Sequence, residues 1–191
     1  MNRDQIHETY KAQLARIESN RALSDHARKV LSAKAYKQAA AQLEAARQVE
    51  IDTLTRQRAA LQRRMFGQAG TADAQTVVAR RDANDRAAQL DDPRKAADML
   101  QRAEMEGDTL MAQAVAARAA QCGWGDVLTA YSTDRPGFAD AAAEFNELPD
   151  PDDWQFNFRH TGQFIATPPS SLANANPGEV DRLAQQDLEV A

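Results

Sequence analysis

The feature that most constrains this chain is residues 25–66, a run that contains neither proline nor glycine. An α-helix rises 1.5 Å per residue, so this run predicts a helix about 63 Å long. Ser24 precedes it as a candidate N-cap, and Asp25 places a carboxylate at the positive end of the helix dipole. Such a helix is too long to pack wholly on a small domain, so we expect a coiled-coil or helical-hairpin partner along it.

Apolar residues form a seam along this helix that is most regular near its C-terminal end. The residues that step by three or four along it are Ile51, Leu54, Arg58, Leu61 and Met65. A second helical face lies in residues 4–20, with Ile6, Tyr10, Leu14 and Ile17. The seam's partner is therefore residues 2–20 folding back, a second copy of the chain, or another protein.

The charge changes sign at Phe66-Gly67. Residues 1–66 carry 13 Lys and Arg against 7 Asp and Glu, whereas residues 67–191 carry 10 against 21. This predicts three parts: a basic helical rod over 1–66, an acidic helical body over 71–148, and a C-terminal part over 149–191. The predicted fold class is all-α, with a long N-terminal helix or coiled coil, a small bundle of short helical hairpins and an extended C-terminal arm.

Start and stop signals divide the acidic body into short helices. Asp92-Pro93 is an N-cap followed by a proline at the first helical position, and Gly107 and Gly123 are helix stops. Thr71 is the expected cap of a preceding helix over 72–90. Small alanines where these helices must approach one another are reminiscent of tetratricopeptide packing, although the 34-residue signature of that repeat is not met.

Aromatic residues follow the acidic turn at 150–153. Trp154, Phe156 and Phe158 alternate with polar residues, which predicts an extended segment with all three rings on one side. This aromatic strap either folds back over the body or adds to another subunit as an extended arm. Its three rings and the five seam residues are the candidate partner-binding residues. Residues 166–178 are predicted to be a linker, and residues 179–190 a short terminal helix.

No arrangement of residues suited to chemistry is found. His7, His26 and His160 are far apart and are expected on the surface, and the single Cys122 is expected as a small buried hydrophobe. The acidic residues Glu144, Glu147, Asp150, Asp152 and Asp153 lack the glycine and spacing of a calcium loop. We therefore expect no catalytic, cofactor or metal site, and not an enzyme. No run approaches the ~18 apolar residues of a membrane span, and no leader is apparent.

The end of the predicted rod is cationic. Its basic residues are Arg47, Arg56, Arg58, Arg63 and Arg64. Phosphate contacts would give salt-dependent, non-specific nucleic-acid binding, but no groove-reading motif accompanies these arginines. A seat for an acidic protein surface, in this chain or a neighbouring copy, is the favoured interpretation.

Five stretches carry a family resemblance. They are Arg64-Met65-Phe66-Gly67, Arg80-Arg81-Asp82-Ala83, residues 102–108, Gly123-Trp124-Gly125-Asp126-Val127, and Tyr131 through Arg135-Pro136. Over residues 20–140 the chain resembles small helical proteins of actinobacterial tailed-phage and prophage structural modules. The resemblance implies a non-catalytic structural or assembly protein that docks in several copies on virion proteins, in the virion or the host cytoplasm. The alternatives are a tetratricopeptide-like adaptor and a nucleic-acid-associated protein that uses the basic rod.

Overall fold

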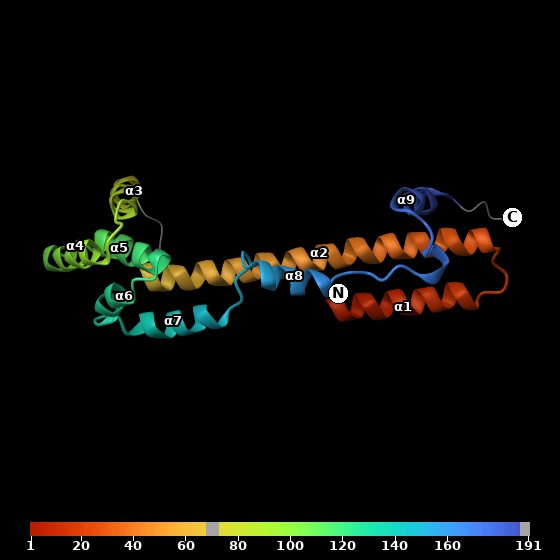
Figure 1. The fold of residues 1–191 in the computed structure, drawn as a ribbon, viewed down its shortest axis with the longest axis horizontal. Helices are drawn as coiled ribbons and strands as arrows, with labels where there is room; N and C mark the ends of the chain where they lie inside the picture. The colour runs from red at the N-terminus through yellow and green to blue at the C-terminus, as the bar shows by residue number, and fades with distance from the viewer. Residues whose placement is uncertain (68–72, 188–191) are drawn as a thin grey trace. The chain divides into compact units, whose positions relative to one another are not determined.

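The structure is a computed structural model that describes residues 1–67 and 73–187. The described residues form helices and connecting segments, without a strand, which confirms the all-α prediction. The helices are α1 (Arg3–Ser19), α2 (Asp25–Phe66), α3 (Ala74–Ala88), α4 (Pro93–Glu106), α5 (Thr109–Cys122), α6 (Gly125–Ser132), α7 (Pro136–Glu147), α8 (Trp154–Gly162) and α9 (Pro177–Gln185), with a 3₁₀ turn, η1 (Ser170–Leu172) (Figure 1).

Packing groups the chain into two compact units that differ from the three parts defined by composition. Unit 1 comprises Met1–Thr55 and Pro149–Ala191, and unit 2 comprises Arg56–Leu148. The long helix α2 therefore contributes its first thirty or so residues to unit 1 and its last turns to unit 2. The expected cap of α2 is confirmed, because the Ser24 hydroxyl accepts a hydrogen bond from the Ala27 amide at 3.1 Å.

Unit 1 is built on a hairpin of α1 and α2, so residues 2–20 do fold back on the long helix (Figure 1). A capping box between Asn2 and Gln5 begins α1, and its carboxyl end is followed by a tight turn. The predicted face of α1 is the one that packs. Its buried residues Ile6, Tyr10 and Ile17 form one cluster with Ala35, Ala39 and Leu43 of α2. Leu43 has no exposed surface, so the hairpin has a closed apolar interior.

The segment that follows α8 is packed, which corrects its expected role as a linker. Phe164 and Ala166 are buried in the α1–α2 cluster, and the Tyr10 hydroxyl donates to the Thr167 carbonyl at 2.8 Å. Further along, Leu172 of η1 and two residues of α9 bury Val30 and Ala33 of α2. Pro169 precedes η1 and Pro177 begins α9, while the apolar residues of the segment cover the hairpin. The terminal helix itself was predicted, and α9 ends at Gln185.

Unit 2 has an alanine-rich core formed by α3, α4, α5 and α6. Helix α5 is central, with Ala112, Val115, Ala116 and Ala119 almost wholly buried. The predicted signals are confirmed here: Asp92 caps α4, Pro93 is its first residue, and Gly107 and Gly123 end α4 and α5 in the left-handed conformation. The helix expected over 72–90 is α3, which Asp73 caps. The expected cap, Thr71, lies outside the described residues.

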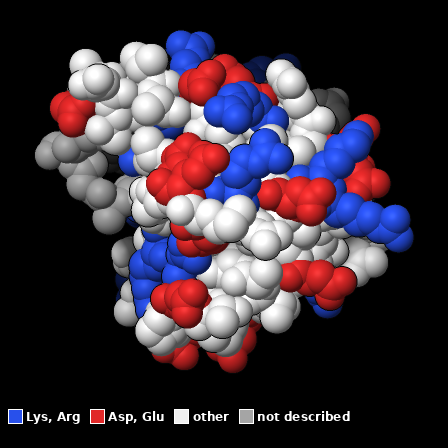
Figure 2. Space-filling model, turned by 90° about the vertical axis from the view of Figure 1, so that its left-hand side faces the viewer, with Lys and Arg blue, Asp and Glu red and all other residues white. Residues whose placement is uncertain are grey.

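Helix α7 covers the last turns of α2. Leu61 and Met65 are buried against Ala141, and Phe138 and Phe145 flank them. Beside this cluster, Tyr131 donates its hydroxyl to the Met65 carbonyl at 3.3 Å in the buried interior. Figure 2 shows positive and negative side chains interspersed on the face that it draws.

Candidate interaction surface

Helix α8 contains the aromatic residues that were predicted to be an extended strap, and that prediction is wrong. The Asp153 carboxylate accepts a hydrogen bond from the Phe156 amide at 2.7 Å and so caps the helix. The Asn157 side chain donates to the Asp153 carbonyl, which fixes the first turn further. The alternation of rings and polar residues at 154–158 therefore falls on a helix. On a helix of 3.6 residues per turn, positions two apart lie on opposite sides and positions four apart on the same side. Phe156 therefore faces away from Trp154 and Phe158.

The inward face of α8 holds Phe156 and His160. The two rings stack with centroids 5.0 Å apart, and His160 also contacts Phe164 at 4.8 Å. His160 Nε2 lies 3.2 Å from a carboxylate oxygen of Glu50 on α2, and only 8% of the residue is exposed. The expectation of a surface histidine is thus wrong at this position, because two aromatic rings, Phe156 and Phe164, and helix α2 surround the imidazole.

The outward face of α8 carries Trp154 and Phe158, four residues apart and one helical turn from each other. Trp154 is 73% exposed and Phe158 is 77% exposed. Their neighbours toward the N-terminus include Asp152 and Asp153, both exposed. We call Trp154 and Phe158 the aromatic pair. It is a compact apolar patch next to negative charge, on a helix whose other face is anchored.

A groove in unit 1 lies where the N-terminal end of α1 meets α2. Its volume is about 610 Å³. The lining residues are Met1, Asn2, Arg3, Ile6, Gln42, Ala45, Ala46, Val49 and Glu50. Val49 is 62% exposed, so its isopropyl group faces the open side. Glu50 lines this groove and also contacts His160 of α8, which places the groove beside that helix.

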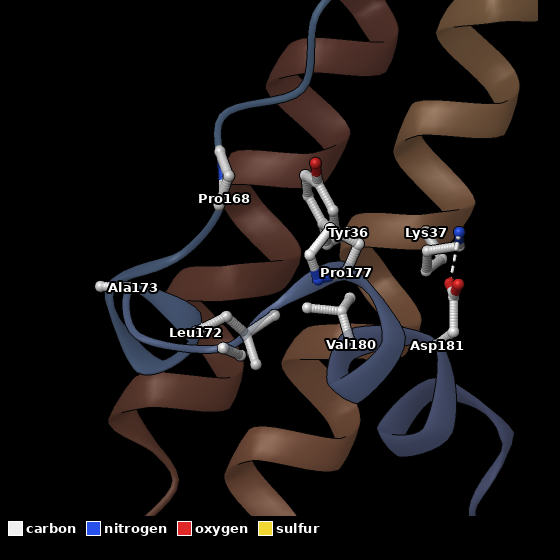
Figure 3. Close-up of a pocket in the computed structure, with 9 residues that line it drawn as sticks. Tyr36, Lys37, Pro168, Leu172, Ala173, Pro177, Val180 and Asp181 are labelled. Atoms are coloured by element: carbon white, nitrogen blue, oxygen red, sulfur yellow. Dashed lines mark ion pairs between the residues drawn. The ribbon is translucent and has the colours of Figure 1, made fainter.

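A smaller pocket of about 310 Å³ lies between α2, η1 and α9 (Figure 3). Tyr36, Leu172 and Val180 give it apolar walls, and the Lys37 ammonium meets the Asp181 carboxylate at 2.6 Å at one side. That hydrogen bond, together with the negative charge of Asp181, raises the pKa of Lys37 above its ordinary value. The ion pair fastens α9 to α2, and the pocket is the space beside this junction.

The five residues of the predicted seam have different surroundings. Ile51 and Leu54 are half-buried, whereas Leu61 and Met65 are covered by α7 of the same chain. Arg58 donates to the Leu148 carbonyl at 2.9 Å, and its guanidinium lies 4.1 Å from the centre of the Phe145 ring. A carbonyl and an aromatic ring, both from the α7 region, therefore provide the contacts of this basic residue on the apolar seam.

The remaining candidates are the single cysteine and possible metal ligands. Cys122 is exposed at the end of α5, so the expectation of a buried cysteine is wrong. Within the described residues, no three His, Cys, Asp or Glu side chains gather in a way that could hold a metal ion. None of the described helices combines the length and apolar character needed to cross a membrane. The candidate site is a surface formed by the aromatic pair and the neighbouring groove.

Comparison with known proteins adds no relative. Searches against protein-family models, curated proteins and solved structures gave no match to this chain.

Proposed function

We propose that this chain is a non-catalytic docking protein that works in several copies, and that its setting is the assembly of a tailed phage. The observation that carries the docking function is the exposure of Trp154 and Phe158 on one face of α8. The phage setting is supported by the resemblance of residues 20–140 to phage structural-module proteins.

The aromatic pair has the properties of an interface anchor. At about 150–250 Å² per aromatic side chain, the exposed fractions of the two rings correspond to roughly 300 Å² of mostly apolar surface. Covering that surface is worth about 7 kcal/mol at ~25 cal/mol/Å², before the costs of association are subtracted. Tryptophan is also the residue type most enriched among interface residues that dominate binding. The anchored inner face fixes the helix backbone that carries both rings, so the freedom lost when a partner covers them is mainly that of the two side chains.

The surroundings of the rings favour a protein partner over nucleic acid. Asp152 and Asp153 beside Trp154 would repel phosphates. Of the arginines near the end of α2, Arg64 is paired with Glu144 at 3.1 Å, and Arg58 is held by the Leu148 carbonyl and a ring. These internal contacts reduce the charge that the end of the long helix offers to a phosphate backbone.

The test is whether the aromatic pair is needed for attachment to particles. Tailed-phage particles from the source lysate are banded in a density gradient, and the chain is measured in the particle band. We expect the wild-type chain in the band and a Trp154→Ser/Phe158→Ser variant depleted from it. A Val77→Ser/Val78→Ser variant is the matched control, because these valines are also exposed, at 52% and 68%, on α3.

Two results would refute this function. A wild-type chain that is absent from the particle band in lysates that express it would remove the phage setting. Equal recovery of the serine variant of α8 and the α3 control would remove the aromatic pair as the docking element.

A further inference from the structure

We propose that the aromatic pair of one copy docks in the α1–α2 groove of a second copy of this chain. This inference rests on the proposed docking function and names the partner of the same surface. Both halves of the contact belong to unit 1. Every copy therefore presents a protruding apolar feature, Trp154 and Phe158, and a concave one, the groove.

The groove suits aromatic side chains in size and lining. Its volume of about 610 Å³ falls within the ~300–1,000 Å³ that protein pockets use to bury a small ligand, so two rings have room. Ala45 and Ala46 leave the α2 side shallow because their side chains end at Cβ. Ile6 forms part of the floor, and the exposed Val49 offers a further apolar contact.

The charges of the two halves are complementary. Two exposed carboxylates, Asp152 and Asp153, precede Trp154, and the groove includes the Arg3 guanidinium in its lining. Arg3 is half-buried; it pairs with Asp4 at 3.0 Å, donates to the Gln163 side chain, and places its guanidinium 5.8 Å from the centre of the Phe164 ring. These contacts fix the guanidinium at the groove, where a carboxylate of an incoming α8 would be a further partner of opposite charge. In a second pair the charges are exchanged: Glu50 of the groove can meet Arg159 of the incoming α8.

The area is sufficient for association when the contact is made twice. On docking, the aromatic pair buries roughly 300 Å² of its own surface, and the groove that receives it buries a comparable area. Two reciprocal contacts then bury about 600 Å² per copy before the polar rim is counted, close to the ~800 Å² per partner of a standard interface. A single contact buries about half of that. Such a contact closes into a symmetric dimer or propagates from copy to copy, depending on the angle between the copies.

The test measures the mass of the full-length chain by sedimentation velocity from low micromolar to submillimolar concentration. Two variants each remove one half of the contact: Trp154→Ser/Phe158→Ser removes the aromatic pair, and Ala45→Glu/Val49→Glu places charge in the groove. Ala45 and Val49 are both exposed, so these substitutions leave the packed interior intact. Circular dichroism checks that both variants keep the helix content of the wild type. The Val77→Ser/Val78→Ser variant on α3 is the control for general loss of exposed apolar surface.

We expect the wild type and the α3 control to associate with rising concentration, and each half-contact variant to remain monomeric. An equimolar mixture of the two half-contact variants retains one intact contact, so it should form a heterodimer that is weaker than the wild-type assembly. A second readout is the emission of Trp154 in a Trp124→Phe background, which should shift to shorter wavelength as the chain associates.

The inference is overturned if the wild type stays monomeric throughout, if the groove variant associates as the wild type does, or if the mixture of variants remains monomeric. Its failure can be told apart from failure of the proposed function. A monomeric wild type whose α8 variant is still lost from particles means that the aromatic pair docks on a different protein. Self-association through both halves, with no chain in the particle band, refutes the phage setting alone.

Discussion

Two glycines in unit 2 provide a matched pair of substitutions. Gly67, after α2, has φ +70°, and Gly107, at the end of α4, has φ +68°. A Cβ added to Gly67 would lie 2.0 Å from Nε2 and 2.5 Å from Cδ of the Gln113 side chain, whereas a Cβ on Gly107 would meet nothing within 4 Å. Alanine at Gly107 therefore tests the backbone conformation alone. Alanine at Gly67 tests the same conformation together with a collision.

The expected losses of stability follow from the left-handed backbone conformation and from the collision with Gln113. A left-handed conformation costs a non-glycine residue about 1–2 kcal/mol, and the lower entropy of the unfolded alanine chain offsets roughly 0.4–1 kcal/mol of that. Gly107→Ala should therefore reduce the free energy of unfolding by about 1 kcal/mol. In Gly67→Ala the end of Gln113 must move to another position, and an off-rotamer side chain adds about 0.5–1.5 kcal/mol. The total for Gly67→Ala is about 2 kcal/mol.

The assay is urea unfolding of the full chain, followed by circular dichroism, for both single variants and for the same pair in a Gln113→Ala background. Removing the Gln113 side chain should bring the cost of Gly67→Ala down to that of Gly107→Ala and leave Gly107→Ala unchanged. Equal costs for the two alanines in the wild-type background would refute the reasoning. So would an unchanged cost of Gly67→Ala when Gln113 is shortened.

Three further predictions concern the core, a buried tyrosine and a helix cap. Leu43→Ala should lower the free energy of unfolding by about 2–5 kcal/mol, because Leu43 has no exposed surface. Val49→Ala, at an exposed position, should change it by less than ~0.5 kcal/mol, and urea titrations measure both variants. Burial raises the pKa of Tyr10 from 10.0 to about 12, so the unfolded chain loses this proton first. The tyrosine's contribution is present below pH 10 and is lost as the pH rises from 10 to 12, and Tyr10→Phe should flatten that part of the stability profile. Asp92→Ala should lower the free energy of unfolding by about 1 kcal/mol and Asp92→Asn by much less, since asparagine also caps a helix. Thermal unfolding measures both variants, and an equal loss of stability in the two would contradict this prediction.

The sequence predicted the helices of unit 2 well because their signals are local. Asp92 accepts hydrogen bonds from amides two and three residues away, and Gly107 and Gly123 adopt a conformation that side chains disfavour. These effects operate within one or two turns and need no distant contact. The same holds for Ser24 at the start of α2.

The aromatic residues show where pattern reasoning went wrong. Alternation over five residues indicated a strand, while the capping carboxylate of Asp153, just before Trp154, was an equally local signal for a helix. Giving that cap more weight would have predicted α8. It would also have separated Phe156 from the aromatic pair, because positions two apart lie on different faces of a helix.

Apart from α8, what the sequence by itself determined is where the helices begin and end, to within a few residues, and which of their faces are apolar. Only the tertiary structure decided what covers those faces: α1 and residues 164–183 along one part of α2, and α7 over Leu61 and Met65. It also placed His160 inside and Cys122 outside. The physical reason is that caps and turns depend on neighbours in the chain. Burial depends on residues that are distant in sequence, and several partners of similar apolar character were compatible with the same seam.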